Sequence, residues 1–190
     1  MVPLDERAAE AVRARGGDAV AAWAASLGGD GVRVRVVEVS EPPAAGPLST
    51  PEVAAAVDRG RDTALAAARD GMTVLAARGD DGEAGALAHW LAGQAPDPEI
   101  RGPLGALRRL GTPGLCVLTG LALGAGEHGL GFVGEGIAAT AAAAVAVAAE
   151  PDAAARVRVA DLSHPTLGLE ALVERGGLAG ALAALQSAAH

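Results

Sequence analysis

Apolar and polar positions along the chain follow helical spacing in some segments and strict alternation in others. Residues 3–27 carry apolar side chains at helical spacing, interrupted at Gly16 and Gly17, which predicts two short helices. Residues 32–39 alternate Val with Arg and Glu and are rich in β-branched side chains. This segment is the strongest strand pattern in the sequence.

A Pro-rich stretch over residues 40–50 follows this strand and predicts a loop that can act as a hinge. Ser49 or Thr50 then stands where a helix N-cap is expected, with Pro51 and Glu52 in the first turn. The spacing predicts that this helix runs to about Arg69.

Strand patterns and helix patterns continue to alternate along the rest of the chain. The pattern predicts strands at 73–77, 130–133 and 157–162 and helices at 86–91, 104–110, 136–149, 169–175 and 178–188. The apolar run 115–125 is either a helix or a buried segment. Strands separated by helices of this length imply parallel crossover units.

We therefore expect an α/β fold: an open, mostly parallel sheet of four or five strands with helices on both faces. An N-terminal helical arm over 1–30 precedes an α/β domain over 31–190 in this interpretation. Ligands of such sheets bind at the carboxyl ends of the strands.

The composition changes this picture in one respect, which is the size of the core. Apolar residues make up 51% of the 190 residues, yet the aromatic side chains are one Phe, two Trp and no Tyr. Ala, Val and Leu must therefore fill the interior, and small side chains favour close approach of backbones. Such a core buries little area per residue, so we expect an oligomer.

The charged residues exclude several kinds of chemistry. The formal net charge is −8, and all 15 basic residues are Arg, because the sequence contains no Lys. A Schiff-base lysine, a Gly-Lys-Ser/Thr phosphate loop and a Lys-rich nucleic-acid surface are thereby absent. We expect no nucleic-acid partner.

The cysteine content and the apolar runs bear on the location of the protein. Cys116 is the single cysteine and lies in an apolar run, which favours a buried, inert thiol over a nucleophile. The longest apolar runs are shorter than a membrane span, and the first residues lack a secretory pattern. We expect a cytoplasmic protein that does not associate with membranes and that binds neither a metal nor a cofactor.

Three glycine-containing turns are the candidates for a functional site. They are Gly79–Glu83, Gly134–Gly136, and Ser163-His164 followed by Arg175–Ala181. Glycines leave backbone amides open to an anion, and a neighbouring carboxylate can take a proton or hold a ribose hydroxyl. Each turn alone is more typical of plain turn chemistry than of a ligand site. The acidic residues can be solvated caps, and His164 can be a hydrogen-bonded loop residue.

The order of the three turns resembles the nicotinate-nucleotide:dimethylbenzimidazole phosphoribosyltransferases. Gly79-Asp-Asp-Gly82 is similar to the start of the family's Gly-Glu-Met-Gly-Ile-Gly-Asn-Thr-Thr motif, with Asp80 in place of Glu. Phe132-Val-Gly-Glu-Gly136 resembles a strand of the family that ends in Asp-Gly before an Ala-rich helix, with Glu135 in the Asp position. Ser163-His164 matches the start of the family's Ser-His-x-Ser segment.

The resemblance implies a pentosyltransferase of cobalamin nucleotide-loop assembly. Its reaction is phosphoribosyl transfer from nicotinate mononucleotide to a benzimidazole-type base, without a metal or cofactor. Asp80 and Glu174 are then the candidate catalytic residues. The residues expected to bind substrate are Gly79, Gly82, Glu135, Gly136, Ser163, His164, Gly176 and Gly180.

The sequence departs from the family where its proposed general base is expected. The family closes with Leu-Gly-Glu-Gly-Thr-Gly-Ala, and the matching position here is Gly177. Glu174, three residues earlier, could compensate, but an offset of three residues usually turns a side chain by a large angle. The chain is also nearly half a family member short. An inactive homologue, acting as partner or regulatory subunit of a full-length relative, is therefore the alternative. The chain would be a homodimer in the first case or part of a mixed oligomer in the second. A third interpretation is a small nucleotide-binding α/β protein, for which the three turns alone would be sufficient.

Overall fold

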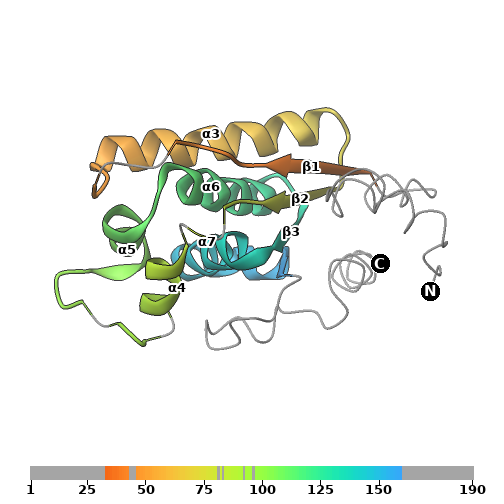
Figure 1. Ribbon diagram of the computed structural model, residues 1–190. Coiled ribbons are helices and arrows are strands. Elements are labelled where there is room, and N and C mark those ends of the chain that lie inside the picture. The colour runs from red at the N-terminus through yellow and green to blue at the C-terminus, as the bar shows by residue number, and fades with distance from the viewer. Residues whose placement is uncertain are drawn as a thin grey trace, which may run out of the picture.

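Four parallel strands form a single sheet (Figure 1). The structure, a computed structural model, describes residues 33–42, 46–80, 82, 84–91, 93–95 and 97–159. The strands are β1 (Val34–Glu38), β2 (Val74–Arg78), β3 (Gly131–Glu135) and β4 (Val157–Val159). They follow one another across the sheet in chain order, and each neighbouring pair is parallel. The predicted parallel α/β fold is confirmed.

Three long helices connect the strands and lie side by side in Figure 1. They are α3 (Thr50–Arg69), α6 (Pro113–Glu127) and α7 (Gly136–Ala149). Strands in chain order joined by right-handed crossovers place their helices on one face of a sheet. Leu75, Ala77 and Phe132 alternate toward this face and share one apolar cluster with the helices. The predicted helices on the second face stay a prediction.

Shorter helices complete the connections. They are α4 (Gly85–Leu91), α5 (Gly102–Leu110) and the 3₁₀ helix η2 (Pro151–Ala155). Helices α4 and α5 contact each other and α7. None of the described helices is long and apolar enough to cross a membrane.

The start of α3 follows from its sequence. Ser49 is the N-cap: its hydroxyl accepts from the Glu52 amide, while the Glu52 carboxylate accepts from the Ser49 amide. This reciprocal pair satisfies two of the amides that a helix start leaves without a partner. The helix ends at Arg69, as predicted, and Gly71 follows with a φ of +72°.

The apolar run 115–125 is part of helix α6. Thr112 caps this helix, and Pro113 occupies its first turn, where the missing amide hydrogen costs nothing. Every residue from Leu115 to Ala125 is buried. The run lacks an amphipathic pattern because α3, α7 and the sheet enclose it.

Glycine brings α3 and α6 into backbone contact. A Cβ added to Gly120 would collide with the backbone of Val57, and one added to Gly60 would lie 2.6 Å from the Leu121 nitrogen. A Cβ on Gly124 would lie 2.8 Å from that of Ala64. The expectation of close backbone approach in an Ala-rich core is confirmed at this contact.

One arginine links the three long helices near the amino ends of the strands. Arg61 of α3 binds Glu127 at the end of α6 and Glu150 just after α7, each at 2.9 Å. These side chains are partly exposed, so each pair contributes little alone. The three charges form a structural link at the end of the sheet opposite the cleft.

Strand β3 is longer than predicted. We expected it to end at Val133 and Gly134–Gly136 to form a turn, but Gly134 and Glu135 continue the pairing with Ala77 and Arg78. Gly136 alone makes the turn into α7, with a φ of +84° that only glycine adopts readily.

Several expectations fall outside the described residues. They are the N-terminal arm over 1–30, the end of the strand predicted at 157–162, and the two helices after residue 168. The division into an arm and a domain over 31–190 stays a prediction.

Candidate functional site

A shallow cleft opens at the carboxyl ends of β1 and β2, where the fold class predicts a ligand. Its lining residues come from four segments: Val39, Ser40, Glu41, Gly79, Asp80, Thr112, Gly114, Leu115, Leu118 and Ala138. The first three follow β1, the next two follow β2, and the others belong to the starts of α6 and α7. The cleft therefore joins segments that lie far apart in the sequence.

The predicted turn after β2 forms one wall of this cleft. The Asp80 carboxylate is exposed, and its Oδ1 accepts a hydrogen bond from the Gly82 amide at 2.9 Å. Gly79 packs closely, because an added Cβ would lie 2.7 Å from Leu118 Cδ1 and 3.4 Å from Ala138 Cβ. The structure thus brings Gly79 and Asp80 to the cleft and explains the glycine by packing.

The first turns of α6 and α7 form the floor. The Thr112 hydroxyl caps α6 by accepting from the Leu115 amide at 3.3 Å. Ala138 lies in the first turn of α7, for which Glu135 is the N-cap residue. Helix starts carry partial positive charge and attract anions. In a chain without Lys, these two starts are a source of positive potential at the cleft.

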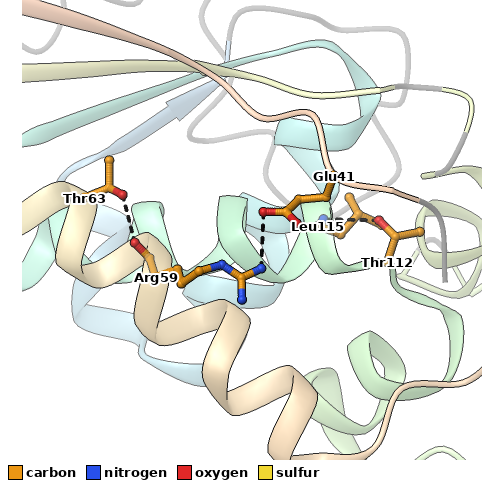
Figure 2. A network of polar contacts seen from close by, with 5 residues as sticks. All are labelled: Glu41, Arg59, Thr63, Thr112 and Leu115. Atoms are coloured by element: carbon orange, nitrogen blue, oxygen red, sulfur yellow. Dashed lines mark hydrogen bonds and ion pairs between the residues drawn. The ribbon is translucent and has the colours of Figure 1, made fainter.

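Glu41 is a cleft residue that the sequence reasoning missed. Its carboxylate pairs with Arg59 of α3 at 3.2 Å, and the two side chains are 29% and 52% exposed (Figure 2). Thr63 binds the Arg59 carbonyl at 2.8 Å within α3 (Figure 2). The one available signal was the position of Glu41, shortly after the strongest strand pattern at residues 32–39.

Glu135 and Gly136 lie at the end of β3 but are not among the residues that line the cleft. Glu135 is half-buried and in register with Arg78 of β2. Strand alternation places both on the face opposite Ala77 and Phe132, away from the helix layer. The structure therefore does not bring Glu135 together with Asp80 in this cleft.

The remaining predicted site residues lie outside the described part of the chain. They are Ser163, His164, Glu174, Gly176 and Gly180, together with Gly177, where the resemblance expects Glu. Their roles stay predictions. Within the described ranges, no group of three or more His, Cys, Asp or Glu side chains is arranged to hold a metal ion.

The single thiol is buried in α6. Cys116 is 0% exposed, and burial raises its pKa to about 12, although the charge of Arg59 acts in the opposite direction. An un-ionised thiol is a poor nucleophile. The prediction of a buried cysteine is confirmed, and its inertness stays a prediction.

We expect native Cys116 to resist thiol reagents at pH 8 and to react at once in denaturant. The unfolded thiol has a pKa of about 8.5, so between that pH and 12 the unfolded chain holds fewer protons than the folded chain. Folding stability therefore falls as the pH rises through this window, relative to Cys116→Ala. Reagent titration and denaturation of both proteins at several pH values measure the two effects. Rapid labelling of the folded protein would contradict the burial.

The described fold defines the class of protein as α/β with a parallel sheet. The cleft lies at the carboxyl ends of the strands, where α/β proteins bind their ligands.

Comparison with solved structures gives the particular fold. The chain is similar to nicotinate-nucleotide-dimethylbenzimidazole phosphoribosyltransferase from Thermus thermophilus, with a TM-score of 0.68 and 23% identity over 96% of this chain and 74% of that one. A structure of CobT from the same organism matches with a TM-score of 0.67 and 23% identity, over 98% of this chain and 76% of that one. No protein-family model matches the chain, and no curated protein does so either.

These matches confirm the resemblance inferred from the order of the turns at the level of the fold. They also correct one expectation. The match covers 74% of the first Thermus chain, so the estimate that nearly half of a family member is missing is wrong for this neighbour.

Proposed function

We propose that the protein transfers the phosphoribosyl group of nicotinate mononucleotide to a benzimidazole-type base. This is a pentosyltransferase reaction of cobalamin nucleotide-loop assembly. The observation that carries the proposal is the position of the Gly79–Gly82 turn: it follows β2 at the cleft of a fold shared with the Thermus phosphoribosyltransferase.

The reaction is a displacement at C1′ of the ribose. A ring nitrogen of the incoming base forms a bond to C1′ while the bond to the nicotinate nitrogen breaks, and the electron pair of that bond neutralises the cationic pyridinium. The site must hold the 5′-phosphate, orient the ribose and place the base in line.

The described residues can perform some of these three tasks. The amides at the starts of α6 and α7 favour the phosphate. Asp80 lines the cleft with an exposed carboxylate that can accept hydrogen bonds from ribose hydroxyls. Glu135 and Gly136, at the end of β3, stay candidates for substrate binding outside the cleft lining.

Nicotinate release tests the proposal. Purified protein incubated with nicotinate mononucleotide and 5,6-dimethylbenzimidazole should release nicotinate and form the ribotide of the base, both measured by chromatography. Nicotinate mononucleotide alone should raise the melting temperature, because a ligand of the native state stabilises it. The absence of both effects at high protein concentration contradicts transfer from this donor.

The second candidate is an inactive homologue that assembles with a full-length relative as partner or regulatory subunit. The observation that favours it is Gly177, which stands where the family resemblance expects the general base. Co-purification should then give a defined mixed oligomer and no nicotinate release by this chain alone. An active homodimer contradicts this alternative. Either assembly would be cytoplasmic.

A further inference from the structure

The cleft contains a second carboxylate besides Asp80, and the family resemblance assigns it no role. Glu41 follows β1, lines the cleft and keeps 29% of its side chain exposed. Arg59 binds its Oε1 at 3.2 Å and is its one polar side-chain partner among the described residues. The second oxygen, Oε2, is left to accept a further hydrogen bond.

Small and apolar residues surround Glu41 in the cleft. Gly114 lies beside it, since an added Cβ would be in van der Waals contact with Val39 Cγ1 at 3.7 Å and Glu41 Cβ at 3.9 Å. Leu115 and Leu118 line the same cleft with side chains that are almost entirely buried, at 2% and 1% exposure. A base bound in this cleft would lie beside one carboxylate that Arg59 orders.

Asp80 is less suited to taking a proton from that ring. Its Oδ1 already accepts from the Gly82 amide, and the residue is exposed to water. Glu41 is better covered and is held by an arginine, so less side-chain freedom is lost when it binds a ligand.

We propose that Glu41 is the proton acceptor for the incoming base, in place of the carboxylate that is missing at Gly177. This inference rests on the proposed phosphoribosyl transfer. One ring nitrogen of the base bonds to C1′ as nicotinate leaves with the electron pair of its glycosidic bond. The proton on the other ring nitrogen passes to the Glu41 carboxylate, so charge and atoms balance without a further reactant. Arg59 is a positioning residue that orients this carboxylate.

A base whose ring nitrogens carry no proton can distinguish a role of Glu41 in proton transfer from its other roles. With 1-methylbenzimidazole the product stays cationic and no proton has to leave. Glu41→Gln keeps an oxygen for Arg59 but cannot take a proton. We expect this variant to lose about 100-fold in nicotinate release with 5,6-dimethylbenzimidazole, which is within the usual contribution of a general base. With 1-methylbenzimidazole we expect its rate to equal that of the wild type.

The matched control is Glu38→Gln, which removes the same charge at the exposed last residue of β1, outside the cleft lining. It should behave as the wild type with both bases. Stabilisation by nicotinate mononucleotide should be unchanged in both variants.

Each other outcome overturns the assignment. Equal rates of wild type and Glu41→Gln with 5,6-dimethylbenzimidazole leave the transfer intact and remove Glu41 as proton acceptor. A similar loss with both bases assigns Glu41 to binding or structure. If the wild type releases no nicotinate with either base, the proposed function fails together with the inference.

Discussion

Gly120→Ala should lower the free energy of unfolding by about 3 kcal/mol, the upper part of the usual range for overpacking a core. The added methyl group has no space, because it would collide with the backbone of Val57 in α3. Neither backbone can move without displacing the rest of the helix layer, since Gly60 and Gly124 also make close contacts on either side. Denaturation in guanidinium chloride measures the effect.

Gly105→Ala is the matched control. Gly105 lies inside α5, and an added Cβ there has no atom within 4 Å. The same chemical change should stabilise the protein by about 0.5–1 kcal/mol, because alanine loses less conformational freedom in a helix. Equal stability of the two variants would show that α3 and α6 are not in backbone contact.

Asp80→Asn should abolish most of the stabilisation of the folded protein that the proposed function predicts for nicotinate mononucleotide. Asparagine keeps an oxygen for the Gly82 amide, so the turn is retained, but the negative charge is lost. Hydrogen bonds to a charged group contribute about 1.5–3 kcal/mol, which corresponds to a loss of affinity of about 10- to 150-fold. Thermal unfolding at increasing nucleotide concentration measures the change.

Asp62→Asn serves as its control, because Asp62 is an exposed residue of α3 that does not line the cleft. Its melting temperature should rise with the nucleotide as that of the wild type does. Full nucleotide stabilisation of Asp80→Asn would remove the Gly79–Gly82 turn from the site.

Local sequence signals predicted an element well where its conformation depends on residues close to it in the sequence. The start of α3 follows from Ser49 and Glu52, which bond each other across a single turn. The end of β3 was misplaced because Gly134 and Glu135 are typical of a turn when taken alone. Their strand conformation depends on pairing with β2, whose residues precede them by more than 50 positions.

The residues of the candidate site also differ in whether local sequence could reveal them. Gly79 and Asp80 were found from sequence because they form a recognisable turn between a strand and a helix. Glu41 has no local pattern, since its partner Arg59 and its neighbour Gly114 come from other helices. The partners of Glu135 in the sheet could not be inferred for the same reason. Only the fold brings such residues together.

The glycine contact between α3 and α6 also constrains the order in which the protein assembles during synthesis. Val57 and Gly60 leave the ribosome before Gly120, their partner in the folded chain, and α4 and α5 emerge in between. Until α6 arrives, the small-residue side of α3 has no complementary backbone to contact, so a β1–α3–β2 fragment lacks its main helical neighbour. The nascent chain is therefore expected to gain its protease resistance late, when α6 has been released.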